Sequence, residues 1–330
     1  MQTSAALSTD GLVSLSAIRD AAARIRGVAR RTALVQASPS WEGSRLFLKC
    51  ENQQPAGAFK IRGAYNMMIQ LPADERRRGV ITYSSGNHGQ AVALSAKLLG
   101  VPAVIVMPTT APRVKVDGAQ ALGADVIFEG TTTLERRARA EAEQMALGLT
   151  MIPPFDHEAI IAGQGTLGLE MMEQCPDATA IYVQVGGGGL ASGVAAAVKR
   201  LNPQVRVIGV EPDGAPKMSR SLAAGHPVVI DRPSSIADGL LAVTPGALTF
   251  RHVQALVDEV VTVTDQQIAD AVRWIFREGK VVAEPSGAVS VAALLAARAA
   301  GRVSRTTIAV LSGGNVAPDL FARLLTGESR

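Results

Sequence analysis

The stretch AIYVQVGGGGLASGVAAAVKRL, residues 180–201, decides the fold class of this chain. It begins with a short apolar run, continues through four glycines and ends in an alanine-rich pattern typical of a helix. Apolar runs without polar alternation are typical of parallel strands that are covered on both faces. A strand that passes directly into a helix is half of a βαβ unit. The stretch therefore predicts an open α/β sheet.

The same alternation of strand and helix recurs along the chain. Further apolar runs, which we interpret as strands, lie at residues 80–85, 103–108, 125–130, 205–212 and 307–315. They form two groups, at about 80–128 and about 180–310. The segment MIPPFDH, residues 151–157, separates the groups, and its paired prolines are typical of a crossing point. We therefore predict two lobes with open, mostly parallel sheets flanked by helices.

The composition excludes several classes of protein. Hydrophobic residues make up 47% of the 330 residues and charged residues 19%, which is typical of a globular chain. The formal net charge is +4 and aromatic residues make up only 4%, so we expect no nucleic-acid partner. No apolar run is long enough for a membrane span, and the N-terminus lacks a signal-peptide pattern. Cys50 and Cys175 lack metal-type spacing, so we predict free thiols and a cytoplasmic protein.

The glycine run Gly186–Gly189 predicts a phosphate-binding loop. Four successive glycines cost conformational entropy, and close approach of the backbone to a phosphate is the leading reason to keep them. Two cofactors remain open at this point. Gly186, Gly188 and Ala191 satisfy a loose dinucleotide fingerprint, and Glu211 ends the next strand, where a ribose-binding acid is expected. An NAD-dependent oxidoreductase is therefore one hypothesis.

The segment YSSGNHGQ, residues 83–90, predicts a second binding loop. Ser84, Ser85 and Asn87 follow a strand and open a helix, where free backbone N–H groups suit an anionic ligand. The alternative is an elaborate helix cap, but a cap needs only one such residue. His88 by itself is compatible with a purely structural role.

Lys60, in the segment PAGAFKIRGA at residues 55–64, has unusually apolar neighbours. Burial favours a neutral amine, and a neutral amine is a nucleophile toward a carbonyl carbon. Such a lysine, a phosphate loop and hydroxyl and amide donors together favour pyridoxal phosphate as cofactor. The NAD hypothesis leaves Lys60 and the SSGNHG loop unexplained. The alternative for Lys60 is a surface lysine with a buried stem and a solvated ammonium group. That alternative explains neither the SSGNHG loop nor the glycine run.

Six motifs together resemble one family of enzymes. GAFKIRGAYN, SSGNHGQA, VGGGGL, SIADGL, EPSGA and LSGGN occur in the order seen in fold-type II pyridoxal-phosphate enzymes. The chain is most similar to the serine/threonine dehydratase and serine racemase branch, over about residues 15–325. The resemblance implies a two-lobed, tryptophan synthase β-like fold and a homodimer. It places a large cofactor-binding lobe at 1–64 and 156–330 and a small mobile lobe at 65–155.

The resemblance also implies roles for matched positions. Lys60 would hold pyridoxal 5′-phosphate as a Schiff base and then act as general base. The other cofactor contacts would be Phe59 beside Lys60, Asn87 at the 3′-oxygen, Gly186, Gly187, Gly188 and Gly189 at the phosphate, and Ser312 at the pyridine nitrogen. The substrate carboxylate would be surrounded by Ser84, Ser85, Asn87 and His88.

The implied activity is that of a dehydratase, or ammonia-lyase, which converts a 3-hydroxy amino acid such as L-threonine or L-serine to a 2-oxo acid and ammonia. Ser85 leaves open a serine-type racemase with dehydratase side activity, because its hydroxyl would exchange a proton on the face opposite Lys60. Leu240, Leu241 and Ala242 either widen the pocket for 3-phenylserine or 3-hydroxyaspartate or are neutral loop substitutions. Ala58 stands where relatives often carry a hydroxyl residue.

A departure from the family concerns metal binding. Relatives that bind a divalent cation have a glutamate after the GVE strand and an acid six residues later. Here Glu211 is present, but the later position is Lys217. Its ammonium would neutralise Glu211, so we predict no Mg²⁺ or Ca²⁺ there. The chain also lacks room for the regulatory domain of biosynthetic relatives, which favours a catabolic role.

Overall fold

The computed structural model describes residues 11–37, 43–84, 86–111, 113–302 and 305–327. Within them the chain forms a six-stranded sheet, in the order β1-β2-β10-β7-β8-β9, and a four-stranded sheet, in the order β5-β4-β3-β6. Pairing is parallel throughout except between β1 and β2. The predicted α/β class with mostly parallel sheets is therefore confirmed.

The strands are β1 (Leu34–Gln36), β2 (Arg45–Cys50), β3 (Val80–Tyr83), β4 (Ala103–Met107), β5 (Asp125–Phe128), β6 (Thr150–Met151), β7 (Ala180–Gln184), β8 (Arg206–Pro212), β9 (Glu259–Val263) and β10 (Thr306–Leu311). The α-helices are α1 (Leu15–Arg24), α2 (Lys60–Met68), α3 (Ala73–Arg78), α4 (Asn87–Leu99), α5 (Arg113–Ala121), α6 (Thr133–Leu147), α7 (Glu158–Gln174), α8 (Gly189–Leu201), α9 (Lys217–Ala224), α10 (Ala247–Leu256), α11 (Asp265–Trp274), α12 (Pro285–Ala299) and α13 (Pro318–Thr326). Short helical turns are η1 (Glu51–Gln53), η2 (Pro55–Gly57), η3 (Asp238–Leu240) and η4 (Ile275–Gly279).

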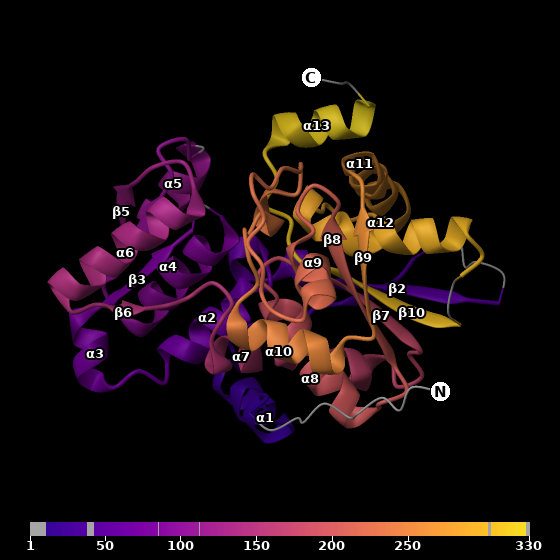
Figure 1. The fold of residues 1–330 in the computed structure, drawn as a ribbon. Helices are drawn as coiled ribbons and strands as arrows, with labels where there is room; N and C mark the ends of the chain where they lie inside the picture. Colours follow the sequence, from indigo (N-terminus) through magenta and orange to yellow (C-terminus); the bar gives the residue numbers. More distant parts are fainter. Residues whose placement is uncertain (1–10, 38–42, 85, 112, 303–304, 328–330) are drawn as a thin grey trace.

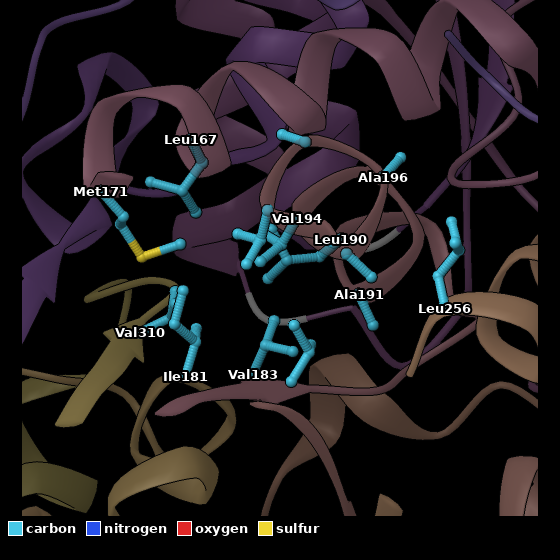
Figure 2. Close-up of a cluster of buried hydrophobic side chains, with 14 of the residues drawn as sticks. Leu167, Met171, Ile181, Val183, Leu190, Ala191, Val194, Ala196, Leu256 and Val310 are labelled. Carbon is cyan, nitrogen blue, oxygen red and sulfur yellow. The ribbon is translucent and has the colours of Figure 1, made fainter. Parts of the chain in front are cut away.

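The larger sheet is covered on both faces. All residues of its inner strands β7 and β10 are buried, as expected for strands without polar alternation. One face packs against α1, α7, α8 and α10, and the other against α11 and α12. Figure 2 shows the first of these cores, where helix side chains lie over β7 and β10. The labelled members include Leu167, Met171, Leu190, Val194, Ile181, Val183 and Val310.

The four-stranded sheet lies beside the larger one, on the left in Figure 1, with α3, α4, α5 and α6 around it. Its strands all fall inside the predicted small lobe at 65–155, although the exact lobe boundaries and the mobility stay predictions. One strand differs from expectation: β5 has no buried residue and leaves Phe128 49% exposed. It is an edge strand, so only part of its surface is covered. No helix of the described residues is long and apolar enough to cross a membrane.

Helices α2, α7 and α8 cross at backbone contact. A Cβ on Gly163 of α7 would lie 2.5 Å from the Arg62 carbonyl oxygen of α2. A Cβ on Gly193 of α8 would lie 2.4 Å from the Ile161 carbonyl oxygen of α7. Only glycine permits so close an approach. The crossing fixes α2, and therefore its first residue Lys60, against α7, which packs on the larger sheet.

Candidate active site

The loop before Lys60 is pinned to the end of β10. The Phe59 amide donates to the Ser312 carbonyl oxygen at 3.0 Å. Asn315 donates from Nδ2 to the Ala56 carbonyl oxygen at 2.8 Å, and Ala56 itself has a positive φ of 63°. The segments predicted to hold the lysine and Ser312 are thus brought together, although they lie at opposite ends of the chain.

Lys60 is half-buried and lies among groups that do not carry a charge. Its Nζ donates to the Pro154 carbonyl oxygen at 2.8 Å and lies 5.2 Å from the centre of the Phe59 ring. Desolvation lowers the pKa of Lys60 from 10.5 to about 8. A substantial fraction of the amine is therefore neutral near pH 8, which is the form that reacts with a carbonyl carbon.

The glycine loop leads into α8 with its backbone donors free of side-chain caps. Gly188 is the N-cap, has a φ of +102°, and no side chain of the described residues caps α8. A Cβ on Gly187 would lie 2.2 Å from the Phe155 ring, so this position of the loop has no room for a larger residue. Uncapped N–H groups at a helix start, with no side chains in the way, form an anion site.

The shape of the glycine loop is held by α10. Thr249 donates from Oγ1 to the Gly187 carbonyl oxygen at 2.6 Å. The Asp156 carboxylate accepts from the amides of Ala247, Leu248 and Thr249, each at 3.0 Å, and so caps that helix. Because Phe155 precedes Asp156, this cap also fixes the ring that packs against the glycine loop.

Asn87, the first residue of α4, lies between Glu284 and Asn315. Its Nδ2 donates to Glu284 Oε1 at 2.6 Å, and its Oδ1 accepts from Asn315 Nδ2 at 2.8 Å. These two contacts set which way the amide faces and leave one N–H of Asn87 for a ligand. Burial and the nearby Asp238 raise the pKa of Glu284 from 4.5 to about 8.

The other residues predicted around the substrate have separate outcomes. Ser84 accepts from the Gly86 amide at 3.2 Å rather than capping α4, and no side chain of the described part caps that helix. His88 is buried, and its Nε2 lies 3.0 Å from the Ile152 carbonyl oxygen. Burial and the neighbouring Lys60 lower the pKa of His88 to about 3, so its ring is neutral. Ser85 lies outside the described residues.

A buried charge network anchors α2 two residues after Lys60. Arg62 donates to both oxygens of Glu51, at 2.7 and 2.9 Å, and to both oxygens of Glu170, at 2.7 and 3.0 Å. Lys49 completes the network through Glu170 Oε2 at 2.6 Å. Burial alone would lower the pKa of Arg62, but Glu51 and Glu170 raise it above its usual value.

Glu211 does not fit the role of a ribose-binding acid. Its carboxylate is fully buried, accepts from the amides of Met218 and Ser219 at the start of α9, and lies 3.1 Å from Lys217 Nζ. Because the Glu211 side chain is 0% exposed, it cannot reach a ligand. Glu211 therefore gives no support to a dinucleotide site.

The residues present fit pyridoxal phosphate. The uncapped glycine loop suits its phosphate and the half-buried Lys60 suits its aldehyde. Asn87 and Ser312 are linked to the loop before Lys60, and their side chains have donors that suit its ring. Sequence reasoning missed four residues of this site, although each lay in or beside a quoted motif. They are Pro154, Phe155, Glu284 and Asn315. The two buried thiols, Cys50 and Cys175, are free, as predicted.

Comparison with known proteins gives the family. Residues 25–314 match the family described as "Pyridoxal-phosphate dependent enzyme". The chain is 43% identical over 316 residues to an L-threonine ammonia-lyase from Thermotoga maritima, covering 95% of this chain and 78% of that protein. It is 40% identical to an L-threo-3-hydroxyaspartate ammonia-lyase from Pseudomonas sp, covering 93% and 97%. The structure of maize serine racemase matches with a TM-score of 0.89 at 39% identity, covering 96% and 97%. This chain therefore belongs to the family of pyridoxal-phosphate dependent enzymes.

Proposed function

We propose that this enzyme is an ammonia-lyase that converts a 3-hydroxy amino acid, with L-threonine and L-serine as default substrates, to a 2-oxo acid and ammonia. The observation that carries the proposal is Lys60, a half-buried lysine whose pKa is lowered to about 8. It is linked through Pro154 and Phe155 to an uncapped glycine loop. The ammonia-lyases among its relatives support the same reaction class.

The site residues divide the work between holding the cofactor and moving a proton. Pyridoxal phosphate, when bound, supplies an electron sink for the negative charge that develops at the substrate α-carbon. The amides of the glycine loop would bind its phosphate, Ser312 its ring nitrogen and Asn87 its 3′-oxygen. Lys60 would hold the cofactor covalently through Nζ.

The proton transfer follows from the chemistry of Lys60. As a neutral amine, Lys60 takes the α-proton of the substrate on Nζ. The electron pair of that C–H bond forms a double bond to the β-carbon, and the β-hydroxyl leaves as water after gaining a proton. The resulting enamine moves a proton from nitrogen to the β-carbon to become an imine, and hydrolysis of that imine gives the 2-oxo acid and ammonia. His88 is neutral and faces a carbonyl, so we assign it no proton transfer and propose only that it borders the substrate carboxylate.

Three further proposals concern the organisation of the molecule. We propose that the chain divides into a large lobe, 1–64 and 156–330, and a small lobe, 65–155, that moves to exclude water. We propose that the enzyme is a homodimer, which light scattering after gel filtration would check. We also propose a cytoplasmic location, which the two unpaired thiols support.

The test is a panel of L- and D-serine, L-threonine, 3-hydroxyaspartate and 3-phenylserine, with 2-oxo acid formation and enantiomer exchange both measured. Lys60→Ala should lose the visible absorbance of the bound cofactor and all turnover, because no amine remains to hold the cofactor or take the proton. Lys97→Ala, an exposed lysine on α4, is the matched control and should retain both.

Cofactor-loaded enzyme that forms no 2-oxo acid from any member of the panel would overturn the ammonia-lyase. Enantiomer exchange faster than elimination would instead favour a serine-type racemase, the activity named for the maize relative. Ser85→Ala belongs in the same panel, and unchanged racemisation in that variant would remove the role proposed for Ser85.

A further inference from the structure

The Lys217 ammonium lies within a cage of four oxygen atoms. Its Nζ is 2.9 Å from the Val185 carbonyl oxygen, 3.0 Å from that of Leu240 and 3.1 Å from that of Ala215. The fourth oxygen is Glu211 Oε1, also at 3.1 Å, and both charged side chains are 0% exposed. Lysine is rarely buried completely unless it is paired.

The cage joins three segments of the chain. Val185 immediately precedes the glycine loop, Ala215 belongs to the turn after β8, and Leu240 ends η3. The side chain of Leu240 also packs on the loop, because a Cβ on Gly186 would lie 3.4 Å from Leu240 Cδ2. A cation at the centre of the cage therefore holds the base of the glycine loop against η3.

The chemistry of the cage selects a cation of ammonium size. Every group around Nζ accepts hydrogen bonds, so the charged amine, with three N–H donors, is the form that satisfies it. The remaining acceptor positions of Glu211 are used by the Met218 amide, the Ser219 amide and the Ser219 hydroxyl. The distances of 2.9 to 3.1 Å exceed the roughly 2.0–2.6 Å that Mg²⁺ and Ca²⁺ require. A divalent ion thus fits neither the spacing nor the space that the lysine side chain fills.

We propose that Lys217 is a built-in cation, so that this enzyme needs no dissociable metal ion to hold its glycine loop. Removal of the side chain leaves four buried oxygens, one of them charged, around a space that K⁺ or NH₄⁺ fits. The unfolding experiments on the cage need no substrate and do not depend on the proposed function. Only the activity measurement rests on that function.

The experiment compares wild type, Lys217→Ala and Lys217→Met by thermal unfolding in tetramethylammonium chloride and, at equal ionic strength, in ammonium or potassium chloride. Lys217→Ala should unfold about 5 to 10 °C lower in the bulky salt, because Glu211 loses its buried partner. Ammonium or potassium ions should restore much of that loss. Lys217→Met should be destabilised and should not respond, because its side chain fills the space.

The wild-type protein provides an arm that does not depend on folding of a variant. Its unfolding temperature should be unchanged by a chelator and by added Mg²⁺, Ca²⁺ or K⁺. A fall with chelator, or a rise with a divalent ion, would overturn the proposal. It would also be overturned if ammonium chloride did not raise the unfolding temperature of Lys217→Ala, or if it raised that of Lys217→Met by as much.

Activity of the cofactor-loaded proteins separates this inference from the proposed function. If wild type shows no turnover but the salt-dependent unfolding is as expected, the cage stands and the reaction assignment fails. If wild type turns over hydroxy amino acids but loses activity on chelation, the reaction stands and the built-in cation fails.

Discussion

At the scale of single residues, burial acts on Lys60 and Glu284 in opposite directions and brings both pKa values to about 8. Desolvation penalises the charged form of each group, so it lowers the pKa of the amine and raises that of the acid. Near neutral pH Glu284 is then mostly protonated, while part of Lys60 is neutral. The site thus contributes little negative charge of its own, which favours an anionic cofactor.

The raised pKa of Glu284 predicts a pH dependence of stability. The folded protein binds this proton more tightly than the unfolded chain, so the stabilisation is complete below about pH 4.5 and is lost as the pH rises through about 8. Relative to Glu284→Gln, the wild-type free energy of unfolding should fall by up to about 5 kcal/mol over that range. Urea unfolding across the range would measure it. Asp231→Asn, which changes a carboxylate that is 92% exposed, is the control, and parallel profiles for wild type and Glu284→Gln would contradict the assignment.

Which residues of the site could be predicted depends on where their partners lie in the sequence. Lys60 and the glycine loop were identifiable because their neighbours along the chain are unusual for their residue types. Glu284 and Asn315 belong to the site because both hydrogen-bond to Asn87, which lies 197 and 228 residues away in the sequence. Local patterns carry no information about such contacts. The roles of Asn87 and Ser312 came from the resemblance, and the structure brings both next to the loop of Lys60.

At the scale of elements, the strands that could be predicted are those with long apolar runs. β7 and β10 are buried throughout and were clear in the sequence. β2 was missed because its sequence, RLFLKC, includes two basic residues, of which Lys49 is buried in the charge network. β1 and β6 are only 3 and 2 residues long, and β9 is a half-covered edge strand. Periodicity reports burial along one element, and it fails where burial depends on a distant ion pair.

The contact between the glycine loop and Phe155 predicts a double-variant effect. In Gly187→Ala the new Cβ would lie 2.2 Å from the Phe155 ring, so the loop or the ring must shift. We expect cofactor affinity to fall about tenfold or more, since overpacking costs about 1–3 kcal/mol. Phe155→Leu in the same chain should restore part of it. Gly186→Ala is the matched control, because its nearest atoms lie at 3.4 Å. Cofactor titration measures wild type, Gly187→Ala, Phe155→Leu, the double variant and Gly186→Ala, and strictly additive losses would refute the clash.

The network around Arg62 predicts a large loss of stability on its removal. Arg62→Met would leave Glu51, which is 0% exposed, without the arginine it pairs with. Glu170 would lose its ion pair with Arg62 and keep the one with Lys49. We expect the free energy of unfolding to fall by about 3–5 kcal/mol. Arg139→Met removes an arginine whose side chain is 40% exposed and should cost less than about 1 kcal/mol. Urea unfolding of the two variants gives the comparison, and equal losses would show that the network does not stabilise α2.

At the scale of the whole molecule, an ion pair joins α5, beside the small sheet, to η3, next to the site. Lys115, on α5 beside the small sheet, donates from Nζ to Asp238 Oδ2 of η3 at 2.9 Å. Asp238 is tied to the site through Ser286, whose hydroxyl lies 3.3 Å from Asp238 Oδ1 and accepts from the Gly239 amide. Because Lys115 is on the proposed mobile lobe and Asp238 is not, we propose that this pair helps to hold the small lobe against the large one.

Removal of that bridge should loosen the lobe without unfolding the protein. Asp238 is 61% exposed, so the pair is partly screened by water and is worth at most about 1 kcal/mol. In Lys115→Met we expect faster hydrogen exchange in α5 and at residues 237–240, a KM raised about threefold and an unfolding temperature changed by less than about 2 °C. Arg113→Met is the matched control, because the ion pair of Arg113 with Asp117 lies within α5 itself. If both variants changed exchange and KM alike, the effect would belong to α5 alone, and Lys115 would have no part in closing the lobe.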